Sequence, residues 1–441
     1  MLNRLFRLDQ HRTTPLREFQ AGLTTFAAMA YILAVNPAIL ANAGMDKGAL
    51  VTVTAALATA LMAGLTNYPI ALAPGMGINA FFTFTICLGK GIAWSEALGM
   101  VFINGLIFLV LSVSGVREKI MAAIPHSLKI AVTCGIGLFI ALIGLKNGGI
   151  IVGNAATLVS AGDFTASSTA LCLGGILLTL ILVARRVPGA MVLSIATITI
   201  LGLFIPSGGG KITQLPASFW ALPHSPAPVF LKLTFNFLTN GPAFVTALPL
   251  ILTLLLVDMF DNIGTLLAVT KRAGLLAADG TLPRAGRALL ADSIATITSA
   301  LGGTSTVVSY IESTAGVEAG GRTGLTTLTT AGLFLAALFF TPLILMVPVA
   351  ATAPALVIVG IFMMQSVGEI AMDDFKLAAP AVLTIWAIPL TFSSAEGLGL
   401  GLIAAAVVAL GSGQPKLLTK FGYVVAGIFF LQFLKIWPFS G

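Results

Sequence analysis

The sequence predicts an all-α polytopic membrane protein with about fourteen transmembrane spans, arranged as two inverted repeats of seven. Composition is the first reason: 57% of the 441 residues are hydrophobic and only 9% are charged, against roughly 25% in soluble domains. Second, apolar runs long enough to cross a hydrocarbon core of about 30 Å recur along almost the whole chain. Third, two of these runs, at corresponding places in the two halves, are interrupted by glycine, proline and polar residues.

The apolar runs set the predicted spans. The first half holds 20–40, 49–66, 70–88, 94–114, 127–146, 168–185 and 189–205, and the second holds 242–270, 286–302, 305–320, 324–347, 354–371, 377–393 and 396–411. Between them, the polar stretch from Pro206 to Pro228 is typical of an external loop, with an interfacial patch at Phe219 and Trp220. An odd number of spans per half puts the halves in opposite orientations, as in many secondary transporters.

The chain is thereby divided into five parts. These are a cytoplasmic N-terminal segment (1–18), a first repeat (19–205), an external linker (206–241), a second repeat (242–412) and a C-terminal segment with an extra apolar helix (413–441), which either crosses the membrane or lies at its surface. Arginines in the first segment, without a signal-peptide pattern, predict a cytoplasmic N-terminus in the cytoplasmic (inner) membrane.

Charge and cysteine usage exclude several function classes. The net charge of +7 is spread in short clusters between spans, so a nucleic-acid partner is not expected. The 3 cysteines and 3 histidines show no metal-ligand spacing, and no phosphate-binding loop follows a strand. We therefore expect no metal and no other cofactor, and any transport would be driven by a gradient.

The two interrupted runs are the best sequence pointers to a site. "YPIALAPGMGINAFFTF" (Tyr68 to Phe84) is broken by proline and glycines, and "GGTSTVVSYIESTAGVEAGG" (Gly302 to Gly321) begins with a β-branched run typical of a short strand. Non-helical backbone at membrane depth is tolerated only where protein or a polar cavity satisfies it. Short strands in the third and tenth spans, each followed by a half-helix, therefore predict a substrate site near the midplane.

Glu312 is the strongest single candidate in these runs. It lies where the predicted strand gives way to the half-helix, so its carboxylate could accept two hydrogen bonds from a ligand with adjacent N–H groups. The alternative is that Glu312 only caps its own helix. Glu318, two turns on, is expected at the cytoplasmic end, paired with Arg322.

Three aspartates within spans are further candidates, because a carboxylate at the bilayer centre costs at least about 2.5 kcal/mol and usually faces a cavity or a partner. Asp258 and Asp261 lie three apart on one helix face. The small polar neighbours of Asp261, including Thr265, are typical of a cavity wall, whereas Asp258 could equally pair with a neighbouring span. For Asp292, structural pairing and function both stay open.

Uncharged candidates complete the pattern. Asn79 could donate to and accept from a ligand edge, and Phe81 could stack on a planar ring, although a core role is the default for a phenylalanine here. The hydroxyls of Thr24 and Thr25 could instead bond back to their own helix.

Several motifs together resemble one family. "AGLTTFAAMAYILAVNP", "APGMGINAFF", "FDNIGTL", "LPRAGRALLADS", "GTSTVVSYIES" and "GVEAGGRTGLT" occur in order along nearly the whole chain. They closely resemble the AzgA-like purine permeases, a branch of the nucleobase/ascorbate transporter superfamily. The resemblance implies the uracil-permease type of fold, with a core domain and a gate domain, the gate formed by the fifth to seventh and twelfth to fourteenth spans.

The resemblance also implies a transporter, not an enzyme, that takes up guanine, hypoxanthine or adenine together with protons. It matches Asp261, Asp292 and Glu312 to the family's functional acidic residues and puts Thr25 and Met29 near the cavity. "APGMGINAFF" favours guanine and hypoxanthine. The full set of candidate substrate-binding residues is Glu312, Asp261, Asn79, Thr25, Phe81, Phe260, Thr265, Ser313 and Met29, and the candidate proton-coupling residues are Asp261, Asp292 and Asp258.

The expected partners are a purine nucleobase, the proton and the lipid bilayer, and a homodimer stays open. Two alternatives keep the fold: an adenine-preferring permease, and a sulfate-type anion transporter, which should surround its site with cationic or neutral groups rather than carboxylates. A third, an intramembrane aspartyl protease, would need Tyr-Asp and Gly-x-Gly-Asp motifs in two spans, and neither occurs.

Overall fold

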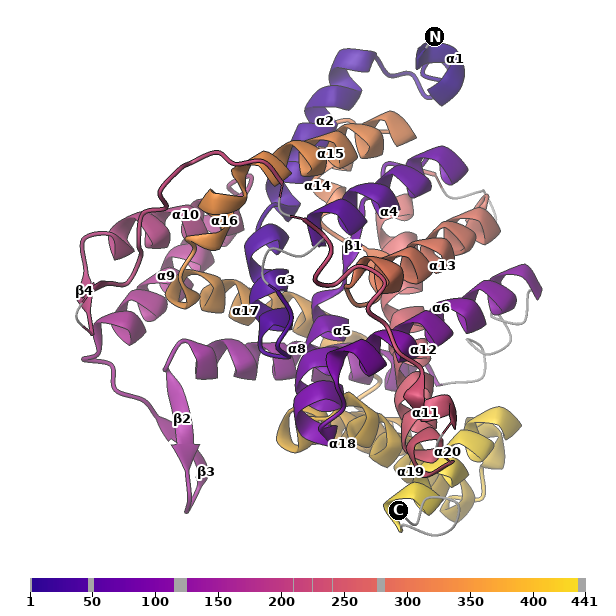
Figure 1. Ribbon diagram of the computed structural model, residues 1–441. Helices are drawn as coiled ribbons and strands as arrows, with labels where there is room; N and C mark the ends of the chain where they lie inside the picture. The colour runs from indigo at the N-terminus through magenta and orange to yellow at the C-terminus, as the bar shows by residue number, and fades with distance from the viewer. Residues whose placement is uncertain are drawn as a thin grey trace.

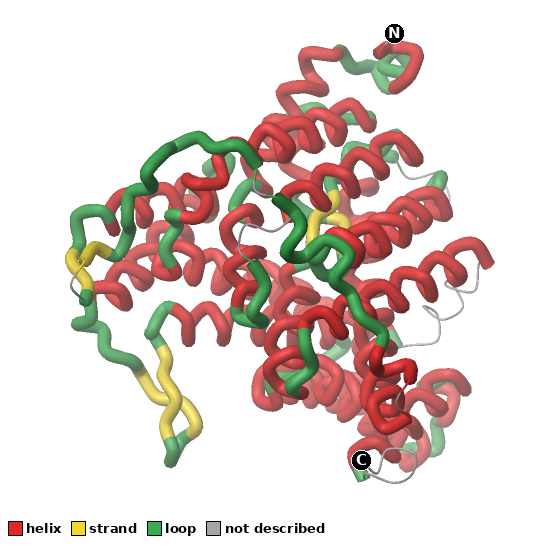
Figure 2. The backbone as a smooth tube through the Cα atoms, viewed as in Figure 1, coloured by secondary structure: helices red, strands yellow, loops and turns green. Residues whose placement is uncertain are grey.

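The computed structural model describes residues 2–46, 51–114, 125–208, 210–223, 225–239, 241–275 and 282–434, without the side chains of residues 4, 260, 263, 264 and 267. Helices dominate this part of the chain, and the strands are short (Figure 2).

The first half begins with a span bent near its middle, because α2 ends at Met29 and α3 begins at Ile32. Its helices and strands are α1 (Leu2–Phe6), α2 (Pro15–Met29), α3 (Ile32–Ala41), α4 (Val51–Thr66), β1 (Leu72–Pro74), α5 (Met76–Ala80), the π-helix η1 (Phe81–Gly89), α6 (Trp94–Ser114), α8 (His126–Asn147), β2 (Ile151–Asn154), β3 (Leu158–Ala161), α9 (Ser167–Ala184), α10 (Ala190–Gly202), β4 (Pro206–Ser207) and β5 (Gly210–Lys211).

The second half also contains a short strand followed by a short helix, after two longer helices. Its elements are α11 (Asn236–Thr239), α12 (Gly241–Arg272), α13 (Ala285–Gly302), β6 (Val307–Ser309), α14 (Ser313–Glu318), α15 (Gly324–Ala337), η2 (Leu338–Phe340), α16 (Thr341–Leu345), α17 (Val349–Met364), η3 (Gln365–Glu369), α18 (Phe375–Thr391), α19 (Ser394–Gly411), η4 (Pro415–Leu417) and α20 (Lys420–Phe433).

Each predicted span coincides with a helix or with a strand followed by a helix. Among the described residues, eight helical segments are long and apolar enough to cross a membrane, and further apolar helices are shorter. The chain is therefore a polytopic membrane protein. In the C-terminal segment α20 packs against α19 and buries Val425, Ala426 and Phe429. The division into repeats at 205 and 242 stays a prediction.

The broken third and tenth spans meet in the interior. Strand β1 pairs with β6 in antiparallel fashion, with Ala73 opposite Val308, and both strands are fully buried. On α4, the Thr59 hydroxyl donates to the Leu72 carbonyl at 2.7 Å and accepts from the Leu72 N–H at 3.0 Å. Figure 2 shows this strand pair enclosed by helices, so the two predicted strands pair with each other inside the fold.

The helices form two packed groups. In the first group α13 packs on α4 and α6, and α15 packs on α2 and α4; in Figure 1 these helices lie in a row on one side of the molecule. In the second group α17 packs on α8, α9 and α10, and α18 packs on α8 and α19. Gly137 and Gly360 let α8 and α17 approach closely, since a Cβ on Gly360 would overlap the Gly137 carbonyl oxygen. We call the first group, together with α12 and η1, which pack on α6, and α5, which adjoins η1, the core group, and the second the gate group.

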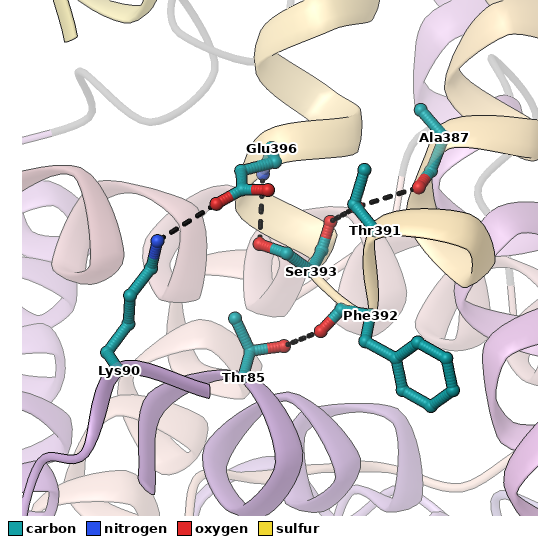
Figure 3. A network of polar contacts seen from close by, with 7 residues as sticks. All are labelled: Thr85, Lys90, Ala387, Thr391, Phe392, Ser393 and Glu396. Carbon is teal, nitrogen blue, oxygen red and sulfur yellow. Dashed lines mark hydrogen bonds and ion pairs between the residues drawn. The ribbon is translucent and has the colours of Figure 1, made fainter. Parts of the chain in front are cut away.

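One contact between the groups lies near the end of η1 (Figure 3). The Lys90 ammonium lies 2.9 Å from Glu396 Oε1, at the start of α19. Beside it, the Thr85 hydroxyl donates to the Phe392 carbonyl at 2.8 Å, and Phe392 itself has a left-handed backbone, with φ of 52°. We call these four residues the clasp.

The second part of the long linker, from Trp220 to Thr234, lies along the core group rather than free in solvent. Its Trp220 ring stacks on Phe339, with centroids 6.1 Å apart, the Leu231 N–H donates to the Leu301 carbonyl and the Thr234 N–H to the Ser95 carbonyl. Trp220 remains 55% exposed, which agrees with the expected surface patch.

Candidate functional site

Glu312 lies in the turn between β6 and α14, as expected, and its side chain is half-buried. The Tyr31 hydroxyl donates to Glu312 Oε1 over 2.5 Å. The Glu312 side chain makes no capping hydrogen bond to its own helix. The hydrogen bond that the helix-cap alternative requires is therefore absent from this turn, and the carboxylate is directed toward the bend of the first span.

The predicted pairing of Glu318 with Arg322 is wrong. Glu318 forms an ion pair with Arg272, at the end of α12. Arg322 instead donates from Nη1 to the carbonyls of Val317 and Gly321, at 2.6 and 2.7 Å. The short α14 ends at Glu318, and the guanidinium donates to carbonyls at and beyond its end instead of pairing with the Glu318 carboxylate.

Asp261 lines a small cavity between the two helix groups. The wall comes from α5 and α12 on the core side and from α8 and α17 on the gate side, and it consists of Gly77, Ile78, Val132, Thr133, Ile136, Val257, Asp261 and Met363. The cavity measures about 10 Å³, which is room for roughly one water molecule. Asp261 and Glu312 lie near enough to influence each other electrostatically.

Asp258 and Asp292 are placed differently from Asp261, because both are fully buried. Asn104 of α6 donates to Asp258 Oδ2 at 3.3 Å, which is the neighbouring-span pairing that the sequence left open. Asp292 lies in α13 and does not line the cavity beside Asp261.

The uncharged candidates are mostly part of the packing around the strands. Ser313 accepts from the Ala71 N–H at 3.0 Å, so its hydroxyl joins the two broken spans. The Thr25 hydroxyl fills the space over Gly316 of α14. Thr24 bonds back to the Gln20 carbonyl at 2.9 Å, as expected for a threonine within a helix. Met29 and Phe81, like Thr25, are buried in the protein and do not line the small cavity.

Asn79 is the candidate whose bonding is incomplete. Its side chain is 0% exposed, and its Oδ1 accepts from the Ser305 hydroxyl. Its Nδ2 has no hydrogen-bond partner among the described residues. Thr265 is half-buried on α12, and the side chain of Phe260 lies outside the described residues.

Sequence reasoning missed the groups that hold the broken spans together. Asn36 Nδ2 and the Tyr310 hydroxyl both donate to the Pro74 carbonyl, at 2.8 and 2.6 Å. Pro74 is the last residue of β1, so its carbonyl accepts these side-chain hydrogen bonds rather than one from β6. Tyr31 and Asn36 look like ordinary residues of an apolar span, and no sequence spacing signals their distant partners.

Glu18 was missed too, although it is a fully buried carboxylate. It accepts from the Arg322, Thr323 and Thr326 N–H groups, and from the Thr323 and Thr326 hydroxyls at 2.8 and 2.6 Å. These donors belong to the start of α15, where unpaired N–H groups favour a negative charge. Glu18 thus fastens the beginning of the first span to the eleventh.

A second cavity, of about 300 Å³, lies between α3 and the start of α17. Its wall consists of Val35, Ala38, Ile39, Ala41, Asn42, Asn147, Val349, Thr352 and Leu356. Tyr31 lies four residues before Val35 and eleven residues before Asn42, so the three residues fall on the same face of α3.

Comparison with known proteins identifies the family of this chain. The Xan_ur_permease model, described as a permease family, matches residues 16–400. The chain is 42% identical to the guanine/hypoxanthine permease PbuG of Bacillus subtilis, covering 97% of this chain and 98% of that one. It is 40% identical to the adenine permease AdeP of Escherichia coli, covering 99% and 96%.

Among solved structures, the fold is similar to the transmembrane domain of the cyanobacterial bicarbonate transporter BicA. The TM-score is 0.62 at 16% identity, over 88% of this chain and 97% of that one. Identity this low shows the fold alone. Together with the extent of the family match, these comparisons show that the chain belongs to the permease family, among the purine permeases of the nucleobase/ascorbate transporter superfamily.

Proposed function

We propose that the protein takes up guanine and hypoxanthine across the cytoplasmic membrane in symport with protons. The observation that carries the proposal is the carboxylate of Glu312, set in the break of the tenth span with Asp261 nearby. Two acidic groups at the junction of two helix groups suit a ligand that offers several N–H donors and no negative charge.

The hydrogen-bonding edge of the base gives the preference. Guanine presents a ring N–H beside an exocyclic amino group, and a carboxylate can accept from both at once. Hypoxanthine keeps the ring N–H. Adenine has an acceptor nitrogen at that ring position, which would face the negative oxygens of Glu312. The site therefore favours the two oxopurines over adenine.

The two cavities support alternating access. The cavity beside Asp261 is too small for a purine in this closed arrangement, and its wall is shared by core and gate helices. A base can enter only if α8 and α17 move relative to α5 and α12. We assign the larger cavity, which lies along α3, as the route by which the base enters from one side of the membrane.

Proton coupling is assigned to the acidic residues of the site. Glu312 accepts N–H donors best as a carboxylate, so Asp261, which lines the cavity, is the group that binds and releases the coupled proton. Asp292 and Asp258 are fully buried and do not line the cavity beside Asp261. They would affect proton transfer only through neighbouring residues. We also propose a cytoplasmic N-terminus and leave a homodimer as an option for assembly.

Two alternatives have specific support. AdeP is a relative with an adenine name, so an adenine preference is the second candidate. BicA shares the fold, but an anion would meet the carboxylates of Glu312 and Asp261, which disfavours the anion-transporter alternative.

The test is uptake of radiolabelled guanine, hypoxanthine, adenine, xanthine and uracil by cells that lack their own nucleobase permeases. We expect accumulation of guanine and hypoxanthine that a protonophore abolishes. Accumulation of adenine alone would favour the second candidate. Accumulation that follows sodium after the proton gradient has collapsed would reject proton coupling.

A further inference from the structure

Tyr31 lies at the bend of the first span, between the end of α2 and the start of α3. Its side chain is only 2% exposed. The Leu33 and Ala34 N–H groups donate to carbonyls three residues back, at Ala30 and Tyr31, so the helix is tightened at this point. The bend directs the Tyr31 ring away from its own helix and toward the tenth span.

The hydroxyl of Tyr31 is the side-chain donor that the structure gives Glu312, within the part of the chain it describes. The oxygens lie 2.5 Å apart, which is short for a hydrogen bond between a hydroxyl and a carboxyl oxygen. The partners are 281 residues apart in sequence. A bond of this kind removes the freedom of the carboxylate to rotate about its last side-chain torsion.

The backbone around this pair is fixed by neighbouring bonds. Asn36, on the same helix as Tyr31, donates to the Pro74 carbonyl, and Tyr310, two residues before Glu312, donates to the same oxygen. Helix α3 is therefore tied to both broken spans. Tyr31 does not have to hold the elements together, because Asn36 and Tyr310 already do so.

We propose that Tyr31 is a positioning residue for the ligand: its hydroxyl holds Oε1 of Glu312 and turns the carboxylate toward the N–H edge of a nucleobase. This inference rests on the proposed function and adds a residue to its site. A carboxylate offers about four lone-pair positions. Tyr31 uses one and a two-donor edge uses two, so the base and the tyrosine bind Glu312 together.

The alternative is that the Tyr31 ring serves only to fill space at the bend of the first span, and its hydroxyl has no role in ligand binding. Tyr31→Phe separates the two roles, since it keeps the ring and removes the hydroxyl. If the hydroxyl positions Glu312, binding of hypoxanthine should weaken about tenfold, the effect of losing a charge-assisted hydrogen bond at the low end of its range. The matched control is Tyr68→Phe, because Tyr68 is buried and its hydroxyl has no hydrogen-bond partner among the described residues.

The decisive experiment is a double-mutant cycle in detergent, with the dissociation constant of hypoxanthine measured for the wild type, Tyr31→Phe, Glu312→Gln and the double variant. A residue that acts through Glu312 has no further effect once Glu312 is changed. We therefore expect the double variant to bind within about twofold of Glu312→Gln, and Tyr68→Phe to bind as the wild type does. Thermal unfolding checks that each variant is folded.

Three results would overturn the inference. Wild-type affinity in Tyr31→Phe would show that the hydroxyl does not matter to the ligand. A tenfold effect that persists in the Glu312→Gln background would assign Tyr31 to packing or to its own ligand contact. If the wild type binds no nucleobase, the proposed function fails as well, and that outcome is distinct from the first two.

Discussion

Lys90 and Glu396 join the two helix groups through an ion pair of 2.9 Å, with about one-third of each side chain exposed. Figure 3 shows the pair beside the hydrogen bond from Thr85 to the Phe392 carbonyl. Exposed pairs contribute only about 0–1 kcal/mol. The ion pair of the clasp is therefore weak enough to open, as the proposed movement of the two groups requires.

A cross-link across the clasp should stop transport. In the variant with Lys90→Cys and Glu396→Cys, a short thiol-specific cross-linker should abolish uptake, because the core and gate groups could no longer move apart there, and a cleavable linker should restore uptake on reduction. The native cysteines, Cys87, Cys134 and Cys172, are buried and should react slowly. Each single cysteine variant is the control. Full uptake by a quantitatively cross-linked protein would contradict the moving-group account.

Gly77 gives a second test of that movement. A Cβ at Gly77 would lie 2.7 Å from Ile136 Cγ2 on α8, so Gly77→Ala should disfavour the closed arrangement by about 1–3 kcal/mol. We expect a severalfold loss of uptake that Ile136→Ala partly restores by removing the clashing methyl group. Uptake assays on both single variants and on the double variant check this. A loss that Ile136→Ala deepens would show that the contact plays no part in closing.

Asp261→Asn should separate binding from coupling. The amide keeps the shape of the side chain but cannot exchange a proton, so we expect bound guanine in detergent and base-for-base exchange in vesicles, without accumulation against a gradient. Both assays use the same purified variant. Accumulation at the wild-type level by Asp261→Asn would remove Asp261 from the proton pathway.

Glu18→Gln should destabilise the protein without changing the site. The glutamine replaces an acceptor oxygen with a donor that faces the Thr323 and Thr326 donors, and we expect a loss of about 3 kcal/mol in the free energy of unfolding. The melting temperature in detergent measures this loss. Asp373→Asn, at an exposed position, is the matched control. An unchanged melting temperature for Glu18→Gln would show that the five bonds to its carboxylate contribute little.

Hydropathy and chain breaks were enough to predict the spans, the two short strands and the place of Glu312 between strand and helix. They worked because span length and backbone interruption are local properties of the sequence. They could not predict that the two strands pair with each other, or that the Tyr31 hydroxyl donates to Glu312. A partner 281 residues away leaves no periodic signal in a single sequence.

The wrong pairing of Glu318 with Arg322 and the missed role of Glu18 have a similar origin, because both depend on contacts that only the folded chain makes. Glu318 and Arg322 are four residues apart, which favours an ion pair within a continuous helix. The helix instead ends at Glu318, and Arg322 donates to the Val317 carbonyl while Arg272 of α12 pairs with Glu318. Glu18 was overlooked because it lies among arginines in a segment that looked exposed, whereas folding places it under the start of α15.

The central claim is that Glu312 binds the base, and equilibrium binding to Glu312→Gln tests it most directly. The change keeps the shape but replaces an acceptor oxygen with an amino group that would point at the ligand's donors. Charge-assisted bonds contribute about 1.5–3 kcal/mol each, so affinity for guanine should fall by about 10- to 150-fold. Glu318→Gln, at the other end of the same helix, should bind as the wild type does.

The measurement is the dissociation constant of guanine or hypoxanthine for purified wild type and Glu312→Gln in the same detergent, with thermal unfolding to verify that both are folded. The account predicts tight binding by the wild type and at least about tenfold weaker binding by the variant. Wild-type affinity in a folded Glu312→Gln protein would contradict it and reduce Glu312 to a structural residue of the turn between β6 and α14.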